Sequence, residues 1–145
     1  LSKRIRIQLI SHTDLNFLAG QDIAKLLYVN TDYQYLKMVE NQLQDISEYI
    51  DVSFSSNRYM EFNKKGVNKG AGLLNLCGML GIPYQESIAI GDNFNDLPMI
   101  RAAGLGVGVR NAVEEIKPMC DVITESTNNE DAVAEVIERF VLSSR

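Results

Sequence analysis

The sequence is poor in the residues that build disulfide frameworks and zinc sites. It has two cysteines, Cys77 and Cys120, which lie in apolar surroundings without metal-ligand spacing, and a single histidine, His12. Two cysteines do not make a disulfide framework. We therefore expect buried, reduced thiols in a cytoplasmic protein. His12 has no serine-centred motif or metal-ligand partner beside it, and we expect it to be a polar loop residue.

Long apolar runs and an excess of positive charge are also absent. The longest apolar run, residues 23–29, is interrupted by Lys25 and is far shorter than the roughly 18–20 residues of a membrane helix. The N-terminus has no apolar stretch followed by a cleavage site, and it does not begin with Met, so we expect a missing upstream piece rather than a secretory signal. The net charge of −5 argues against nucleic-acid binding. Neither a membrane nor a nucleic acid is expected as a partner.

The composition that remains is that of a soluble globular protein. Apolar residues make up 46% and charged residues 23% of the 145 positions, which is enough for one core or two small ones. Two regions differ in pattern, and we place the boundary between residues 63 and 64.

The region before this boundary predicts a small α+β unit. Residues 23–29 are typical of a buried strand, and residues 33–46 place apolar side chains at helical spacing. Residues 51–55 and 59–62 alternate as strands around a polar turn, which predicts a hairpin.

The region after the boundary predicts alternating helices and strands, hence a doubly wound and largely parallel sheet. The final helix is expected to place Val133, Val136, Ile137 and Phe140 on one face. The predicted elements are, in chain order, helix 70–80, strand 87–90, helix 96–103, strand 105–109, a short helix 112–117, strand 121–124 and helix 130–142.

A polar loop joins the predicted strand 87–90 to the next helix. Gly91 would allow a close backbone approach, and Asp92 would project from the carboxyl end of the strand, the edge where open α/β sheets bind ligands. Mg²⁺ takes oxygen ligands and usually one or two protein carboxylates, a role that suits Asp92. Asn95 and Asp96 complete the loop, and Asp96 could orient its neighbours or cap the helix.

Capping alone is the alternative interpretation of this loop, because Asn and Asp are preferred at turns and helix N-caps. Four polar residues within five positions exceed what a cap needs, so a functional loop is favoured. Lys69 stands near the start of a helix beside a glycine and is a plausible phosphate contact. Glycines at 104, 106 and 108 lie within a predicted strand, so we interpret them as close packing rather than as a dinucleotide-binding motif.

Residues 91–100 resemble the fourth conserved motif of the haloacid dehalogenase superfamily, in its Cof-type branch of phosphatases. Residues 66–71 and the helix after them are similar to the third motif, and residues 103–109 with Asn111 and Ala112 also match. The resemblance covers residues 64–145 in the right order and spacing. Residues 1–63 resemble only the later part of that branch's cap domain.

The resemblance implies an α/β fold with the C-terminal half of a doubly wound, Rossmann-like parallel sheet (64–145) and part of a small α+β cap domain (1–63). It further implies a Mg²⁺-dependent phosphatase acting on small phosphorylated metabolites such as sugar phosphates. Lys69 would hold the phosphate and its developing charge, Asp92 would bind Mg²⁺, Asn95 would contact the phosphate, and Asp96 would hydrogen-bond within the site.

One expected feature of such phosphatases is missing. Family members use a nucleophilic Asp two residues before a second Asp, whereas no two aspartates are two positions apart in this sequence. We therefore expect the nucleophile upstream of residue 1, an inactive isolated chain, and self-association through the sheet edge that truncation would expose. A noncatalytic module that binds phosphate and metal, and a phosphomutase on the same fold, remain alternatives.

Overall fold

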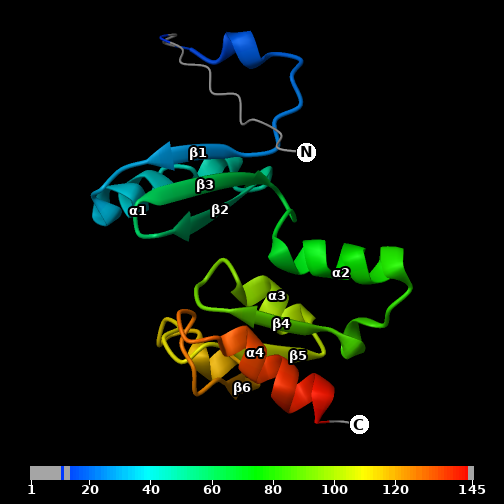
Figure 1. Ribbon diagram of the computed structural model, residues 1–145. Coiled ribbons are helices and arrows are strands. Elements are labelled where there is room, and N and C mark those ends of the chain that lie inside the picture. Colours follow the sequence, from blue (N-terminus) through cyan, green and yellow to red (C-terminus); the bar gives the residue numbers. More distant parts are fainter. Residues whose placement is uncertain (1–10, 12–13, 144–145) are drawn as a thin grey trace.

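The computed structural model describes residues 11 and 14–143, which contain two separate three-stranded sheets (Figure 1). His12 lies outside the described residues. The antiparallel sheet has the order β1-β3-β2 and the parallel sheet the order β4-β5-β6. The strands are β1 (Leu26–Val29), β2 (Ile50–Ser55), β3 (Tyr59–Lys64), β4 (Ile88–Gly91), β5 (Leu105–Gly108) and β6 (Val122–Ile123). This arrangement confirms the α/β fold class, while the division into domains stays a prediction.

The antiparallel unit contains the predicted hairpin. Strands β2 and β3 pair from Ile50↔Lys64 to Ser55↔Tyr59, and Leu36 of helix α1 (Tyr33–Asn41) is fully buried with Met60 of β3. The side chain of Asp32 starts α1 by accepting the backbone N–H groups of the second and third helical residues.

Two predictions for this unit were wrong. The helix expected over residues 33–46 ends at Asn41, because the chain tightens there into three-residue turns, and residues Gln44–Ile46 form a separate 3-10 helix. Strand β1 was expected to be buried, but its four side chains are exposed, since it pairs only with β3 and forms the edge of the sheet.

The parallel unit begins with helix α2 (Lys69–Leu80). The side chain of Asn68 caps its first turn, and Gly81, with a φ of 66°, ends it in the left-handed conformation that glycine adopts easily. Helix α3 (Leu97–Ala102) accepts Pro98 in its first turn, where no N–H partner is needed. Helix α2 packs against α3, and α3 packs on β4 and β5.

The last part of the chain departs from the predicted helices. Residues 112–116 form turns rather than a helix and lead into a short 3-10 helix, Lys117–Met119. Pro118 has no backbone N–H, so it cannot donate the hydrogen bond that would continue an α-helix through this segment. The final helix is divided into α4 (Ala132–Ile137) and a π-helical segment, Glu138–Leu142. Of the four residues expected on its buried face, only Val136 is buried.

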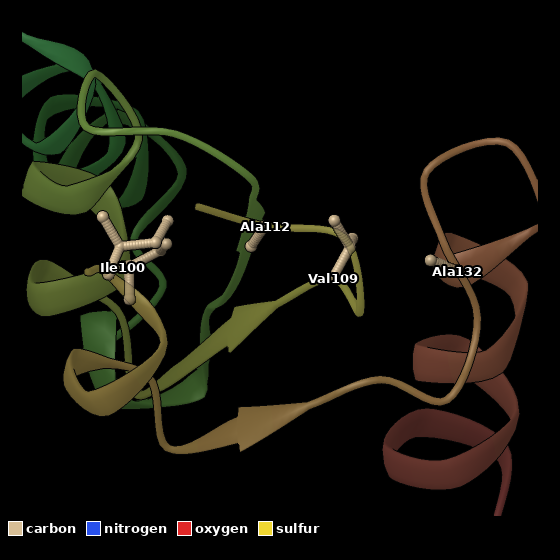
Figure 2. Close-up of a cluster of buried hydrophobic side chains, with 5 residues drawn as sticks. Ile100, Val109, Ala112 and Ala132 are labelled. Atoms are coloured by element: carbon tan, nitrogen blue, oxygen red, sulfur yellow. The ribbon is translucent and has the colours of Figure 1, made fainter. Parts of the chain in front are cut away.

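The core of the parallel unit joins α3 to the start of α4 through the turns after β5 (Figure 2). Those turns enter the core because Ala112 and Ile116 fold inward instead of continuing a helix. The buried cluster consists of Ile100, Val109, Ala112, Ile116 and Ala132.

The free thiol of Cys77 is buried and that of Cys120 is half-buried. Across residues 11 and 14–143, no helix is long and apolar enough to cross a membrane.

Candidate active site

The loop between β4 and α3 folds back tightly over the end of its own strand. A Cβ atom built on Gly91 would lie 2.3 Å from the Cβ of Asp96, so only glycine leaves room for this approach. Gly91 does allow a close approach to its backbone, but the group that makes this approach is the side chain of Asp96 rather than a ligand. The Asp96 residue is 4% exposed as a result.

Asp96 is the central acceptor of the loop. Its Oδ2 atom accepts the backbone N–H groups of Asp92 at 2.9 Å and Asn93 at 3.2 Å, and its Oδ1 atom accepts the ammonium group of Lys69. Burial raises the pKa of this carboxyl, but the hydrogen bonds from Lys69 and the two amides outweigh burial and hold the pKa below its ordinary value. Asp96 makes no side-chain capping bond to α3, so the capping alternative does not explain it.

Lys69 reaches this loop from the first turn of α2. Its side chain is half exposed, so the ammonium group pairs with Asp96 and still borders open space. Because α2 packs on α3, the amino ends of both helices converge beside the loop. Lys69 and Asp96 are 27 positions apart in the chain.

Asp92 lies half-buried at the end of β4 and borders a hollow of about 450 Å³. Burial raises the pKa of its carboxyl above the ordinary value, the neighbouring Asp96 raises it further, and Lys69 acts in the opposite direction. The hollow is also bordered by Asp96, by Asn128 and by Ala132 at the start of α4.

Asn95 faces a different part of the surface. It lines two hollows, of about 520 and 560 Å³, between the loop and the antiparallel sheet, and it shares the smaller one with Lys69. Its side chain makes no hydrogen bond to any described residue. The structure thus links Lys69, Asp96 and Asp92 directly, and it places Asn95 beside Lys69 but away from the hollow at Asp92.

Sequence reasoning named Asn111 only as part of the family resemblance and assigned a role neither to it nor to Asn128. The amide of Asn128 donates to Asp92 Oδ2 at 3.4 Å, and Asn111 holds Asn128 by two hydrogen bonds. Both residues follow the carboxyl ends of parallel strands, β5 and β6, and such ends meet at one edge of the sheet. The position of both asparagines shortly after a parallel strand was therefore the sequence signal that could have identified them.

The oxygen donors here fit a Mg²⁺ ion as part of a site. Asp92 supplies one half-buried carboxylate, whereas Asp96 is already engaged by Lys69 and two amides. Within the described part of the chain, no group of three or more His, Cys, Asp or Glu side chains gathers in a metal-binding arrangement. A single protein carboxylate is compatible with Mg²⁺, which usually retains waters and binds phosphate oxygens.

Comparison with known proteins identifies the family of the chain. A family model of haloacid dehalogenase-like hydrolases matches residues 5–137. The chain belongs to this family. A haloacid dehalogenase-like hydrolase from Bacteroides thetaiotaomicron is 41% identical, with a TM-score of 0.69 over 86% of this chain and 47% of that one.

Two curated relatives have names that state an activity. A 5-amino-6-(5-phospho-D-ribitylamino)uracil phosphatase from Bacillus subtilis is 36% identical over 123 residues, 77% of this chain and 49% of the relative. A phosphoglycolate phosphatase from Methanopyrus kandleri is 42% identical over 83 residues, 57% of this chain and 34% of the relative. This member of the hydrolase family thus spans about half the length, or less, of the relatives that it matches.

Proposed function

We propose that the chain is part of a Mg²⁺-dependent phosphatase that hydrolyses small phosphorylated metabolites, such as sugar phosphates, through an aspartyl-phosphate. The observation that carries the proposal is the direct link between Lys69, Asp96 and Asp92 at the carboxyl edge of the parallel sheet. In this link the Asp96 carboxylate accepts both Lys69 and the backbone N–H of Asp92, so the ammonium group and Asp92 belong to one loop, which suits the charge stabilisation needed in phosphoryl transfer. The names of the two curated relatives support a phosphatase.

Each residue of the loop has a distinct role in this proposal. Lys69 donates hydrogen bonds to phosphate oxygens and stabilises the charge that develops on them, while Asp96 keeps the ammonium group in place. Asn95, whose amide is uncommitted, contacts the phosphate from the same hollow. Asp92 binds Mg²⁺, which when present would neutralise phosphate charge.

The remainder of the substrate would occupy the hollows that face the antiparallel sheet. Their volumes, about 520 and 560 Å³, suit a small metabolite. Ser53 and Asn63 of the sheet line the hollow that contains Lys69, and neither side chain has a hydrogen bond among the described residues. These neutral polar groups favour a hydroxyl-rich compound over an apolar one.

The nucleophile of the proposed reaction lies upstream of residue 1. The proposal rests on the sequence, in which the two aspartates of the loop, Asp92 and Asp96, are four positions apart and none are two apart. An aspartyl intermediate needs a carboxylate in line with the phosphate. A noncatalytic phosphate-binding module is the second candidate, favoured by the same spacing, and an apolar strand ending in Asp-x-Asp upstream would exclude it.

The test is phosphate release from a panel of sugar phosphates and aryl phosphates by the natural full-length protein, with and without Mg²⁺. Lys69→Met should lower kcat/KM by about 100-fold or more, the typical cost of losing a group that stabilises transition-state charge. Lys117→Met is the matched control, because that lysine pairs with Glu114 and borders none of the three hollows described above. An unchanged kcat/KM in Lys69→Met, or an unchanged rate of phosphate release after Mg²⁺ is removed, would refute the proposal.

A further inference from the structure

We infer that Asn128 is a positioning residue for Asp92, and that Asn111 fixes the orientation in which it acts. The inference rests on the proposed function only in treating Asp92 as a cation ligand. It concerns the segment of residues 125–131, which lies between β6 and α4. Asn128 lies 36 positions from Asp92 in the chain and borders the same hollow.

The two asparagines form a reciprocal pair. The side-chain Nδ2 of Asn111 donates to Oδ1 of Asn128 at 2.9 Å, and the backbone N–H of Asn128 donates to Oδ1 of Asn111 at 3.0 Å. An asparagine amide has one acceptor oxygen and one donor nitrogen. Because Asn111 uses the oxygen of Asn128, the nitrogen of Asn128 must point the other way, toward Asp92.

The donor of Asn128 meets Asp92 at Oδ2, with a distance of 3.4 Å. At this length the bond is weak, and a small closing movement of the loop would bring it into the ordinary range. A donor on one carboxylate oxygen restricts rotation of the carboxylate and determines how it is presented to a cation in the hollow. Hydrogen-bond partners of this kind orient metal ligands and tune their affinity.

The segment that carries Asn128 is itself held in place. The carboxylate of Glu135 accepts the backbone N–H groups of Glu125 and Ser126 at 3.0 and 2.9 Å. Glu130 accepts the backbone N–H of Thr127 and pairs with Arg110. These bonds stabilise the loop without contacting Asp92. A variant that removes one of them therefore tests the effect of loop stability without removing the contact between Asn128 and Asp92.

The test uses Mn²⁺ as the probe and the natural full-length protein, with affinity measured from the loss of the free Mn²⁺ signal in electron paramagnetic resonance. We expect Asp92→Asn to abolish binding and Asn128→Ala to weaken it about 10-fold or more, the usual range for the partner of a metal ligand. Glu130→Gln is the matched control, since it loosens the same loop, and it should change the affinity by less than about twofold. Thermal unfolding of each variant reports loop and fold stability separately.

Asn111 supplies a second, independent test. If Asn111 acts only by orienting Asn128, Asn111→Ala weakens Mn²⁺ binding in the wild-type background and has no further effect when Asn128 is already alanine. The inference is overturned if Asn128→Ala binds Mn²⁺ like the wild type, if Glu130→Gln weakens binding equally, or if the wild type binds no Mn²⁺. If the protein releases phosphate but its Mn²⁺ affinity is unchanged in Asn128→Ala, the proposed function stands and this inference fails. If the protein binds Mn²⁺ in the expected pattern but releases no phosphate, this inference stands and the proposed function fails.

Discussion

Lys69 and Asp96 form an ion pair that joins the first turn of α2 to the residue preceding α3, over the loop after β4. The pair is asymmetric, because the Asp96 side chain is almost buried while the Lys69 side chain is 49% exposed. A buried carboxylate needs its partners, whereas a half-exposed ammonium group can still meet a ligand. The same pair can therefore stabilise the fold and leave the ammonium group accessible to a ligand.

Asp96→Asn should destabilise the fold. The substitution removes the charge that accepts Lys69 and weakens the two amide bonds, and hydrogen bonds to charged groups contribute about 1.5–3 kcal/mol each. Urea unfolding measures the change in the free energy of unfolding, for which we expect a loss of about 1–3 kcal/mol. Asp45→Asn is the control at an exposed position and should stay within about 0.5 kcal/mol.

Gly91→Ala and Gly72→Ala should have opposite effects. A Cβ at Gly91 meets the Asp96 side chain at 2.3 Å and forces it out of place, with a cost of about 1–3 kcal/mol, as in overpacked cores. A Cβ at Gly72, within α2, meets nothing within 4 Å and should stabilise the helix by about 0.5–1 kcal/mol. Equal unfolding midpoints for both variants in urea would contradict the packing described for Gly91.

Glu135→Gln should lower stability in a manner that depends on pH. The backbone N–H of Glu125 is the main cause that lowers the pKa of Glu135 from 4.5 to about 2 in the folded chain. A depressed pKa stabilises the fold above the unfolded value and loses this effect as pH falls. The wild type should therefore unfold at a higher temperature than Glu135→Gln above about pH 4.5, and the difference should vanish between pH 4.5 and 2. A difference in thermal midpoint that is constant from pH 7 to 2 would rule out this assignment.

The 145-residue chain by itself should hydrolyse aryl phosphates no faster than its Asp92→Ala variant, because it contains no Asp-x-Asp pair to supply the nucleophile. Phosphate release from both chains at saturating Mg²⁺ is the measurement. Magnesium-dependent turnover by the isolated wild-type chain, lost in Asp92→Ala, would show that the nucleophile is within these residues.

The sequence by itself determined the ends of helix α2, the loop after β4 and the β2-β3 hairpin. Asn68 and Gly81 mark the ends of α2, and Gly91 to Pro98 mark the passage from β4 into α3, because caps, turns and apolar spacing act through neighbouring backbone groups. Hairpin β2-β3 was predictable for the same reason.

Only the tertiary structure decided which side chains meet. The partner of Lys69 is 27 positions away and that of Asp92 is 36 positions away, and both contacts depend on how helices and strands stack. Strand β1 and Val133 are exposed because no other element covers them. The spacing of apolar residues in the sequence does not encode which surfaces are covered. Local spacing specifies an element through its own backbone, whereas burial and side-chain partners arise from packing between elements distant in the chain.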